Sequence, residues 1–200
     1  LQSNSQLKLC GNFVNNGTLN AMSNSTLLMQ SDAALQHQSM SGGMTGPNKL
    51  WHLTANKPST AGGNKVLLLN DLENAGNFTL GTAAAYQGGI FDAGGKYHKV
   101  AGHFNVYYAT IPNAIYTPAG NTLEFNGAAP QNYFNSGALF NVVMNHSGTG
   151  VVLGNSGATD YMSIAGTLNL NAGKIITGAN RVHVTNAAAA SVTAGNSSSY

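Results

Sequence analysis

The sequence predicts an all-β fold, a right-handed parallel β-helix (β-solenoid) of about eight to ten coils, with a β-sandwich as the structural alternative. Apolar residues rarely recur at helical spacing before Gly, Asn or Pro interrupts them, so long helices are excluded. Short segments of alternating apolar and polar residues end instead in Gly or Asn, as strands between tight turns do. Related segments also recur along the chain, which is typical of stacked coils.

The predicted strands follow one another at short intervals. Within each strand every second residue is apolar, as Leu123 and Phe125 are, and the polar residue between them, Glu124, is expected to point outward. His98 and His183 are also expected on outward positions. Asn and Gly suit the corners, because both tolerate left-handed backbone conformations and Asn can hydrogen-bond to the next coil. The clearest strands are expected at residues 18–20, 77–80, 103–106, 122–126, 167–170 and 181–185.

Two degenerate repeats of about 90 residues are expected within one β-helical segment that spans residues 1–200. Residues 76–80 (GNFTL) resemble residues 166–170 (GTLNL), which lie 90 positions further along the chain. The copies cover residues 11–100 and 102–196, and each has room for about four coils. Because the chain starts without an initiator Met, we expect it to be part of a longer protein.

The C-terminal half carries a family resemblance. Residues 164–196 read IAGTLNLNAGKIITGANRVHVTNAAAASVTAGN, and residues 101–131 begin with AGHF and end with TLEFNGAAPQ. These stretches resemble the units of large, repetitive β-helical, adhesin-like surface proteins of Bacteroidetes, best over residues 101–196. The resemblance implies an exported protein, at the cell surface or outside the cell, of the kind delivered by type IX secretion.

Composition narrows the classes of function. Only 14 of 200 residues are charged, and a net charge of +2 without a cluster of cations leaves no electrostatic footprint for nucleic acid. The longest apolar runs, such as residues 66–69, are far shorter than the roughly 18 residues of a membrane-spanning helix. The single cysteine, Cys10, is expected to be a small buried side chain. A surface rich in Asn, Ser, Thr and Gly favours an extracellular or cell-surface location.

The sequence has only six acidic residues, which leaves few candidates for catalytic carboxylates. Asp71 and Glu73 form the only close pair, and a solvated turn is the preferred interpretation. Asp92 is expected to bond its own turn. Together with Lys96, these acids define an alternative hypothesis, a polysaccharide lyase or hydrolase, because such reactions need paired carboxylates or a base beside a cation. The histidines lack zinc-binding spacing, so no catalytic residue, metal or cofactor is predicted.

Tyrosines in a loop-rich stretch are the candidate carbohydrate contacts. Aromatic rings stack on sugar faces, and Asn and Gln side chains hydrogen-bond to hydroxyl groups. Packing of this stretch against the rod is the competing interpretation. The candidates are Tyr107, Tyr108, Tyr116 and Tyr133, with Phe134 beside them.

The leading hypothesis is a non-catalytic structural or adhesive segment of an extracellular protein. Such a stiff rod would contact cell surfaces, carbohydrate or copies of itself through a broad polar face. Strand addition at the ends of the β-helix is a route to self-association, so a subunit of an extracellular filament is a further alternative.

Overall fold

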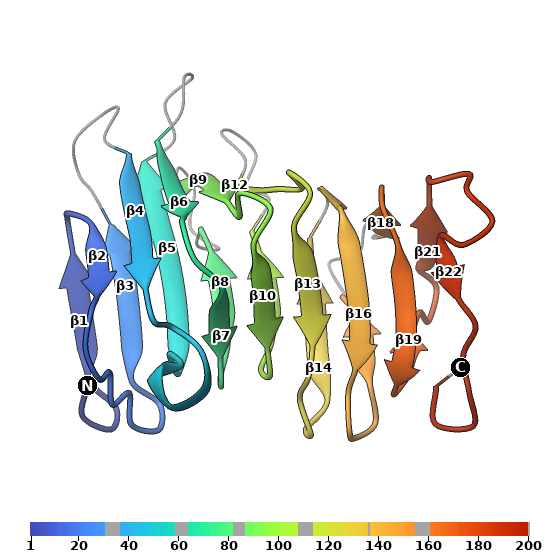
Figure 1. Ribbon diagram of the computed structural model, residues 1–200, viewed down its shortest axis with the longest axis horizontal. Coiled ribbons are helices and arrows are strands. Elements are labelled where there is room, and N and C mark those ends of the chain that lie inside the picture. The colour runs from blue at the N-terminus through green and yellow to red at the C-terminus, as the bar shows by residue number, and fades with distance from the viewer. Residues whose placement is uncertain are drawn as a thin grey trace.

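The computed structural model is a β-solenoid built from parallel sheets, which confirms the predicted fold class. Figure 1 shows short strands lying across the long axis of the molecule, with the two chain ends at opposite ends of the stack. The structure describes residues 1–30, 37–58, 64–81, 87–107, 114–135, 137–154 and 161–199.

One side of the solenoid, which we call sheet A, stacks eight parallel strands. Each strand pairs with the strand one turn further along the chain, so the backbone hydrogen bonds run parallel to the solenoid axis. Sheet A consists of β1 (Gln6–Leu9), β3 (Thr26–Gln30), β5 (His52–Pro58), β8 (Phe78–Leu80), β11 (Phe104–Val106), β14 (Gln131–Phe134), β17 (Val151–Leu153) and β20 (Ile175–Ile176).

The second side is sheet B, followed by a three-stranded sheet that we call sheet E. The end of β5 also pairs antiparallel with β9 at Lys57 and Gly88, which joins sheets A and B. Sheet B consists of β2 (Phe13–Asn15), β4 (Gln38–Gly42), β6 (Lys65–Leu68), β9 (Gln87–Asp92) and β12 (Ala114–Thr117). Sheet E consists of β15 (Ala138–Leu139), β18 (Tyr161–Ile164) and β21 (Arg181–Val184).

The third side, sheet C, has six parallel strands. A short 3₁₀ helix, η1 (Gly46–Asn48), lies in the turn before it, between two single bridges that pair Met44 with Leu72 and Leu50 with Asn74. Sheet C consists of β7 (Leu72–Asn74), β10 (Tyr97–Val100), β13 (Thr122–Phe125), β16 (Asn141–Asn145), β19 (Leu168–Ala172) and β22 (Val192–Thr193).

The solenoid has about six turns that carry strands on all three sides. The two N-terminal turns carry strands on sheets A and B only, among the described residues, and six complete turns follow. Turn length varies with the corner loops: paired residues lie 20 positions apart at Gln6 and Thr26, but 29 apart at Phe104 and Tyr133.

One pair of similar segments lies on different sides of the solenoid. Residues 76–80 contain β8 of sheet A, whereas the similar residues 166–170 contain the start of β19 in sheet C. Strands on all three sides need the same alternation of apolar and polar residues, so segments from different sides resemble one another. The structural period is the single turn.

The apolar core fills the space between the sheets. Parallel pairing stacks equivalent inward residues, so Phe78, Phe104 and Tyr133 form a continuous column beneath sheet A. The rings of Phe78 and Phe104 stack at 5.2 Å, and those of Phe104 and Tyr133 at 5.8 Å. Burial of each such ring stabilises the fold by roughly 1.5–3 kcal/mol.

Two smaller predictions are wrong. Cys10 is exposed, because it lies in the corner between β1 and β2 rather than on an inward strand position. His98, expected to point outward, is completely buried, because Tyr97 and Lys99 take the outward positions of β10. His183 is exposed, as predicted. No helix among the described residues is long and apolar enough to span a membrane.

Candidate functional site

Two of the four candidate tyrosines are core residues, which corrects the expectation that they contact ligand. Tyr133 is 1% exposed because it takes the inward position of β14, directly beside Phe104. Tyr116 is equally buried, and its ring stacks at 5.7 Å on that of Phe91, its partner on the neighbouring strand. Pairing register therefore decides the side to which each ring points, and register is not visible in the local sequence.

Of the other two candidates, the structure describes Tyr107 alone. Tyr108 lies outside the described residues. Tyr107 follows β11 directly, is half-buried, and packs against Phe134 on the outward side of sheet A. Phe134 is itself half-buried, and the centres of the two rings lie 5.5 Å apart at an interplanar angle of 43°.

These two rings line an open hollow of about 430 Å³ on the outer surface of sheet A, which we call the aromatic hollow. The side chains of Asn105 and Asn132 belong to the same lining. The hollow thus combines two ring surfaces with two amide groups that can donate and accept hydrogen bonds. It is lined by Asn105, Tyr107, Asn132, Phe134, Val152, Leu153 and Gly154.

Gly154 allows two neighbouring turns to approach closely at the edge of the aromatic hollow. Its backbone N–H donates a 2.7 Å hydrogen bond to the carbonyl oxygen of Tyr133, which holds the two turns together. A Cβ atom at this position would lie 2.6 Å from that same oxygen and 3.3 Å from the Phe134 ring. The close approach of the two turns therefore requires glycine at position 154.

Among the described residues, the strands that form the aromatic hollow and the strand before them carry no charged side chain. These strands are β8, β11, β14 and β17. Outward residues in register with one another form a polar row leading to Phe134, namely Thr54, Thr79 and Asn105. On these described strands a ligand meets amides, hydroxyls and rings.

Charged residues gather instead on sheet C, around a second hollow of about 490 Å³ that we call the charged hollow. Glu73, Lys99 and Glu124 occupy directly paired outward positions on three consecutive strands, so acid, base and acid alternate along the axis. The charged hollow is lined by Thr45, Gly46, Asp71, Leu72, Glu73, Tyr97 and Lys99.

The carboxylates of this surface are largely occupied by protein groups. Glu73 accepts a 3.0 Å hydrogen bond from the Gly46 N–H and lies 3.5 Å from the Lys49 ammonium. Asp71 accepts a 2.9 Å bond from the backbone N–H of Tyr97. Both carboxylates therefore tie neighbouring turns together.

Glu124 is bound still more completely, although it lies on an outward position. It accepts hydrogen bonds from the Tyr97 hydroxyl at 2.6 Å and the Asn145 amide at 2.9 Å, and Lys99 lies 4.0 Å away. Burial of the phenol, reinforced by its hydrogen bond to the Glu124 carboxylate and by the negative charges of Glu124 and Asp71, raises the pKa of Tyr97 above its ordinary value. Tyr97 therefore remains a hydrogen-bond donor across the physiological range.

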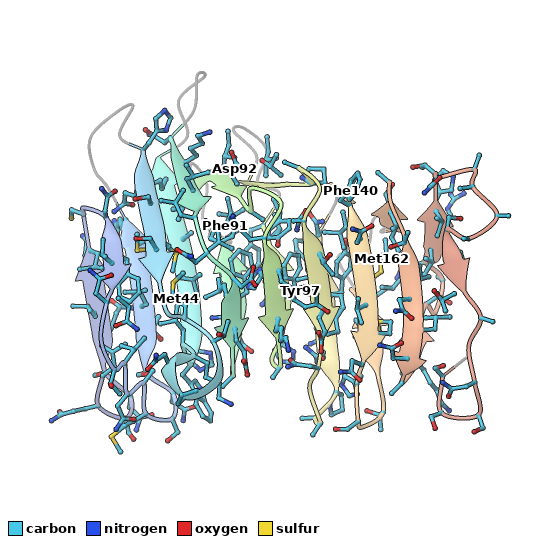
Figure 2. The ribbon with its side chains drawn as sticks, in the orientation of Figure 1. Met44, Phe91, Asp92, Tyr97, Phe140 and Met162 are labelled. Atoms are coloured by element: carbon cyan, nitrogen blue, oxygen red, sulfur yellow. The ribbon has the colours of Figure 1, made fainter. Side chains whose placement is uncertain are left out.

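Asp92 does not belong to the charged hollow, which corrects its grouping with Asp71 and Glu73. It ends β9 on sheet B, forms a 3.0 Å ion pair with Lys65, and accepts a 3.1 Å bond from the N–H of Gly94 within its own turn, as predicted. Figure 2 shows Asp92 apart from Tyr97. Lys96 is not among the residues that line the hollow, although its neighbour Tyr97 is.

Sequence reasoning missed Asn105 and Asn132 on sheet A, and Tyr97, Lys99 and Glu124 on sheet C. The available signal was alternation: if Phe104 points inward, Asn105 must point outward. Across the described ranges, no group of three or more His, Cys, Asp or Glu side chains is placed to hold a metal ion. Comparison with protein-family models gave no match, and neither did comparison with curated proteins or with solved structures.

Proposed function

We propose that the protein is a non-catalytic adhesive rod, exposed at the cell surface or outside the cell, that binds neutral carbohydrate at the aromatic hollow. The observation that carries this proposal is the pairing of Tyr107 and Phe134 with the amides of Asn105 and Asn132 in one open hollow. Pockets of this kind supply apolar surface for the ring face and a few polar groups for orientation.

The described strands that form the hollow carry no charged side chain, which supports an uncharged ligand. An acidic sugar would leave its carboxylate without a cation on β11, β14 or β17. Neutral hydroxyl groups, in contrast, match the donors and acceptors of Asn105 and Asn132. The rigid ladder of parallel strands keeps these groups in place before the ligand arrives, which lowers the entropic cost of binding.

Non-catalytic binding is supported by the hydrogen bonds and ion pairs that already engage the carboxylates. A glycoside hydrolase needs two carboxyl groups free to reach the scissile bond. Glu73 and Glu124 are held by backbone, ammonium, phenol or amide groups, and Asp92 is paired with Lys65. None of these three lines the aromatic hollow.

A glycan array read in parallel with a turnover assay tests the proposal. We expect neutral oligosaccharides to bind without being cleaved, and Phe134→Ala to weaken binding at least about tenfold, because truncating an aromatic anchor commonly costs more than 1.4 kcal/mol. Thr54→Ala is the matched control, since Thr54 lies in the same outward row but does not line the hollow. Preferential binding of acidic glycans, or binding unaffected by Phe134→Ala, would overturn the proposal.

The second candidate is a polysaccharide lyase or hydrolase acting at the charged hollow. The observation that favours it is the approach of Asp71, Glu73, Tyr97 and Lys99 around one open space. Cleavage of a polysaccharide that is lost in Asp71→Asn and Glu73→Gln, and retained in Phe134→Ala, would establish this candidate. Absence of cleavage across neutral and acidic polysaccharides would dismiss it.

Association between copies is a third proposal, and the exposed apolar residues of the end turns favour it. Leu7, Val14 and Met22 are exposed near one end, and Ile176 and Val192 near the other. The outermost strands also present backbone groups to strand addition. Sedimentation over a wide range of concentration tests this route: assembly that disappears in Val14→Lys supports it, and a monomer throughout contradicts it.

A further inference from the structure

A ladder of hydrogen bonds follows one corner of sheet A and ends at the aromatic hollow. His52, Asn77, His103 and Asn132 occupy equivalent positions on successive turns, each just before or at the start of its strand. The backbone N–H of Asn77 donates to Nδ1 of His52 at 2.8 Å, and that of His103 donates to Oδ1 of Asn77 at 2.8 Å. In the third bond, the N–H of Asn132 donates to Nδ1 of His103 at 3.0 Å.

The two kinds of acceptor in this ladder respond differently to acid. An amide oxygen accepts a hydrogen bond at any physiological pH, so the link through Asn77 is permanent. An imidazole nitrogen accepts only while it carries no proton, and histidine changes charge between about pH 5 and 8. The bond to Asn132 therefore depends on a neutral His103, whereas burial lowers the pKa of His52 and favours its neutral ring.

Nothing described around His103 compensates a positive charge on its ring. The strand that follows it, β11, and the neighbouring strands β8 and β14 contain no acidic or basic residue. The side chains next to it in the ladder are the neutral amides of Asn77 and Asn132, and the nearest titratable member is His52, two turns away. The ion pairs found among the described residues involve Glu73, Asp92 and Glu124, on sheets B and C.

Asn132 connects the hydrogen bond of His103 to the aromatic hollow. Its side chain lines the aromatic hollow, and Phe134, two residues further, lines the same hollow from the same side of β14. A proton on Nδ1 of His103 would face the N–H of Asn132, donor against donor, so one of the two groups must move. Movement of Asn132 would disturb the amide and the ring that line the hollow.

We propose that protonation of His103 opens the hydrogen bond to Asn132 and thereby weakens carbohydrate binding at the aromatic hollow in mildly acidic medium. The carbohydrate part of this statement rests on the proposed function. The local rearrangement does not, because it follows from the His103–Asn132 bond itself. Loss of one such bond corresponds to binding about three- to tenfold weaker at pH 5.5 than at pH 7.5.

The test uses His103→Asn, since Asn77 already fills the equivalent role one turn earlier. Cellohexaose, mannohexaose and xylohexaose serve as neutral probes in calorimetric titrations at pH 7.5 and 5.5, with circular dichroism confirming the fold at both. We expect the wild type to lose affinity at pH 5.5 and His103→Asn to bind equally at the two values. His183→Asn, which removes an exposed histidine on sheet E, is the matched control and should keep the pH dependence.

A second readout requires no ligand. The backbone amide of Asn132 and the ring protons of Phe134 and Tyr107 should shift together in NMR spectra between pH 7.5 and 5.5, and should stay unchanged in His103→Asn. If these signals ignore the titration, or if His103→Asn retains the loss of affinity, the pH proposal is wrong even though carbohydrate binding stands. If none of the three probes binds at either pH while the signals shift as expected, the proposed ligand class fails and the His103 switch stands.

Discussion

The Nε2 atom of His98 lies 2.9 Å from the Oδ1 atom of Asn74, in the interior of the solenoid where neither side chain has any exposed surface. On its other side, Nδ1 of His98 lies 3.1 Å from the hydroxyl of Tyr116, which also accepts a bond from the Asn121 amide. Aromatic rings enclose this polar chain, with Phe78 at 4.9 Å from the imidazole centre. His98 is thus held neutral by a dry, tightly packed environment.

This burial predicts acid sensitivity of the fold. Desolvation lowers the pKa of His98 from 6.5 to about 3, so between these values the unfolded chain binds a proton that the folded chain does not. The contribution of His98 to stability is therefore complete above about pH 6.5 and is lost as the pH falls toward 3, at about 1.4 kcal/mol per pH unit. Urea denaturation across this range measures the slope.

His98→Gln provides the comparison, because glutamine keeps hydrogen-bonding capacity without titrating. We expect the slope of its unfolding free energy against pH to fall by the equivalent of one proton. His183→Gln, at an exposed position, should leave the slope unchanged. Equal slopes for wild type and His98→Gln would show that His98 is not buried as a neutral group.

Loss of a phenyl ring is expected to lower stability much more on the inward side of β11 than on the outward side of β14. Phe104→Ala removes a fully buried ring from the column with Phe78 and Tyr133, and should lower the free energy of unfolding by about 3–5 kcal/mol. Phe134→Ala removes a half-buried outer ring and should cost about 1 kcal/mol or less. Thermal denaturation of the two variants separates these outcomes, and similar losses would contradict the assignment of sides.

Gly150 marks a corner that no other residue can form. Its φ is +117°, and a Cβ atom there would lie 2.3 Å from the carbonyl oxygen of Lys174. Gly150→Ala should therefore lower stability by at least about 2 kcal/mol. Gly17→Ala is the control, because no atom lies within 4 Å of its added Cβ, and it should change stability by about 0.5 kcal/mol or less. Chemical denaturation of both variants checks the prediction.

The hydrogen bond from the Tyr97 hydroxyl indicates a structural rather than a catalytic role for Glu124. Tyr97→Phe removes the 2.6 Å bond to this poorly exposed carboxylate, and should lower stability by about 1.5–3 kcal/mol, as loss of a charged hydrogen bond does. Carbohydrate binding at the aromatic hollow, on another sheet, should be unchanged. Denaturation together with a binding titration checks both parts. Loss of binding without loss of stability would indicate that carbohydrate binds at sheet C instead.

Much of the fold was predictable because a parallel β-solenoid repeats one simple rule. Alternation places Leu123 and Phe125 inward, and the structure buries both. Alternation alone does not settle the direction of residues 131–134, because Tyr133 and Phe134 are adjacent aromatic residues that point to opposite sides. Only the pairing of Tyr133 with Phe104 determines which of the two rings is buried. Long-range register, rather than local pattern, makes that choice.

The candidate site was predictable only in part for the same reason. The stretch that contains Tyr107 and Phe134 stood out by composition, but Asn105 and Asn132 join it from two successive turns through register. Asp71 and Glu73 stood out by spacing, whereas Lys99 reaches them through parallel pairing across a turn. His98 looked like an outward residue because its polar partners, Asn74 and Tyr116, come from other turns.

The most direct test of the proposed function is calorimetric titration of cellohexaose, mannohexaose and xylohexaose into the wild type, Tyr107→Ala, Phe134→Ala and Thr54→Ala at pH 7.5, followed by chromatography of the recovered sugar. We predict that at least one hexasaccharide binds and is recovered intact, that both ring variants weaken its binding at least about tenfold, and that Thr54→Ala binds as the wild type does. Cleaved sugar, or equal binding by wild type and Phe134→Ala, would contradict a non-catalytic carbohydrate site at the aromatic hollow.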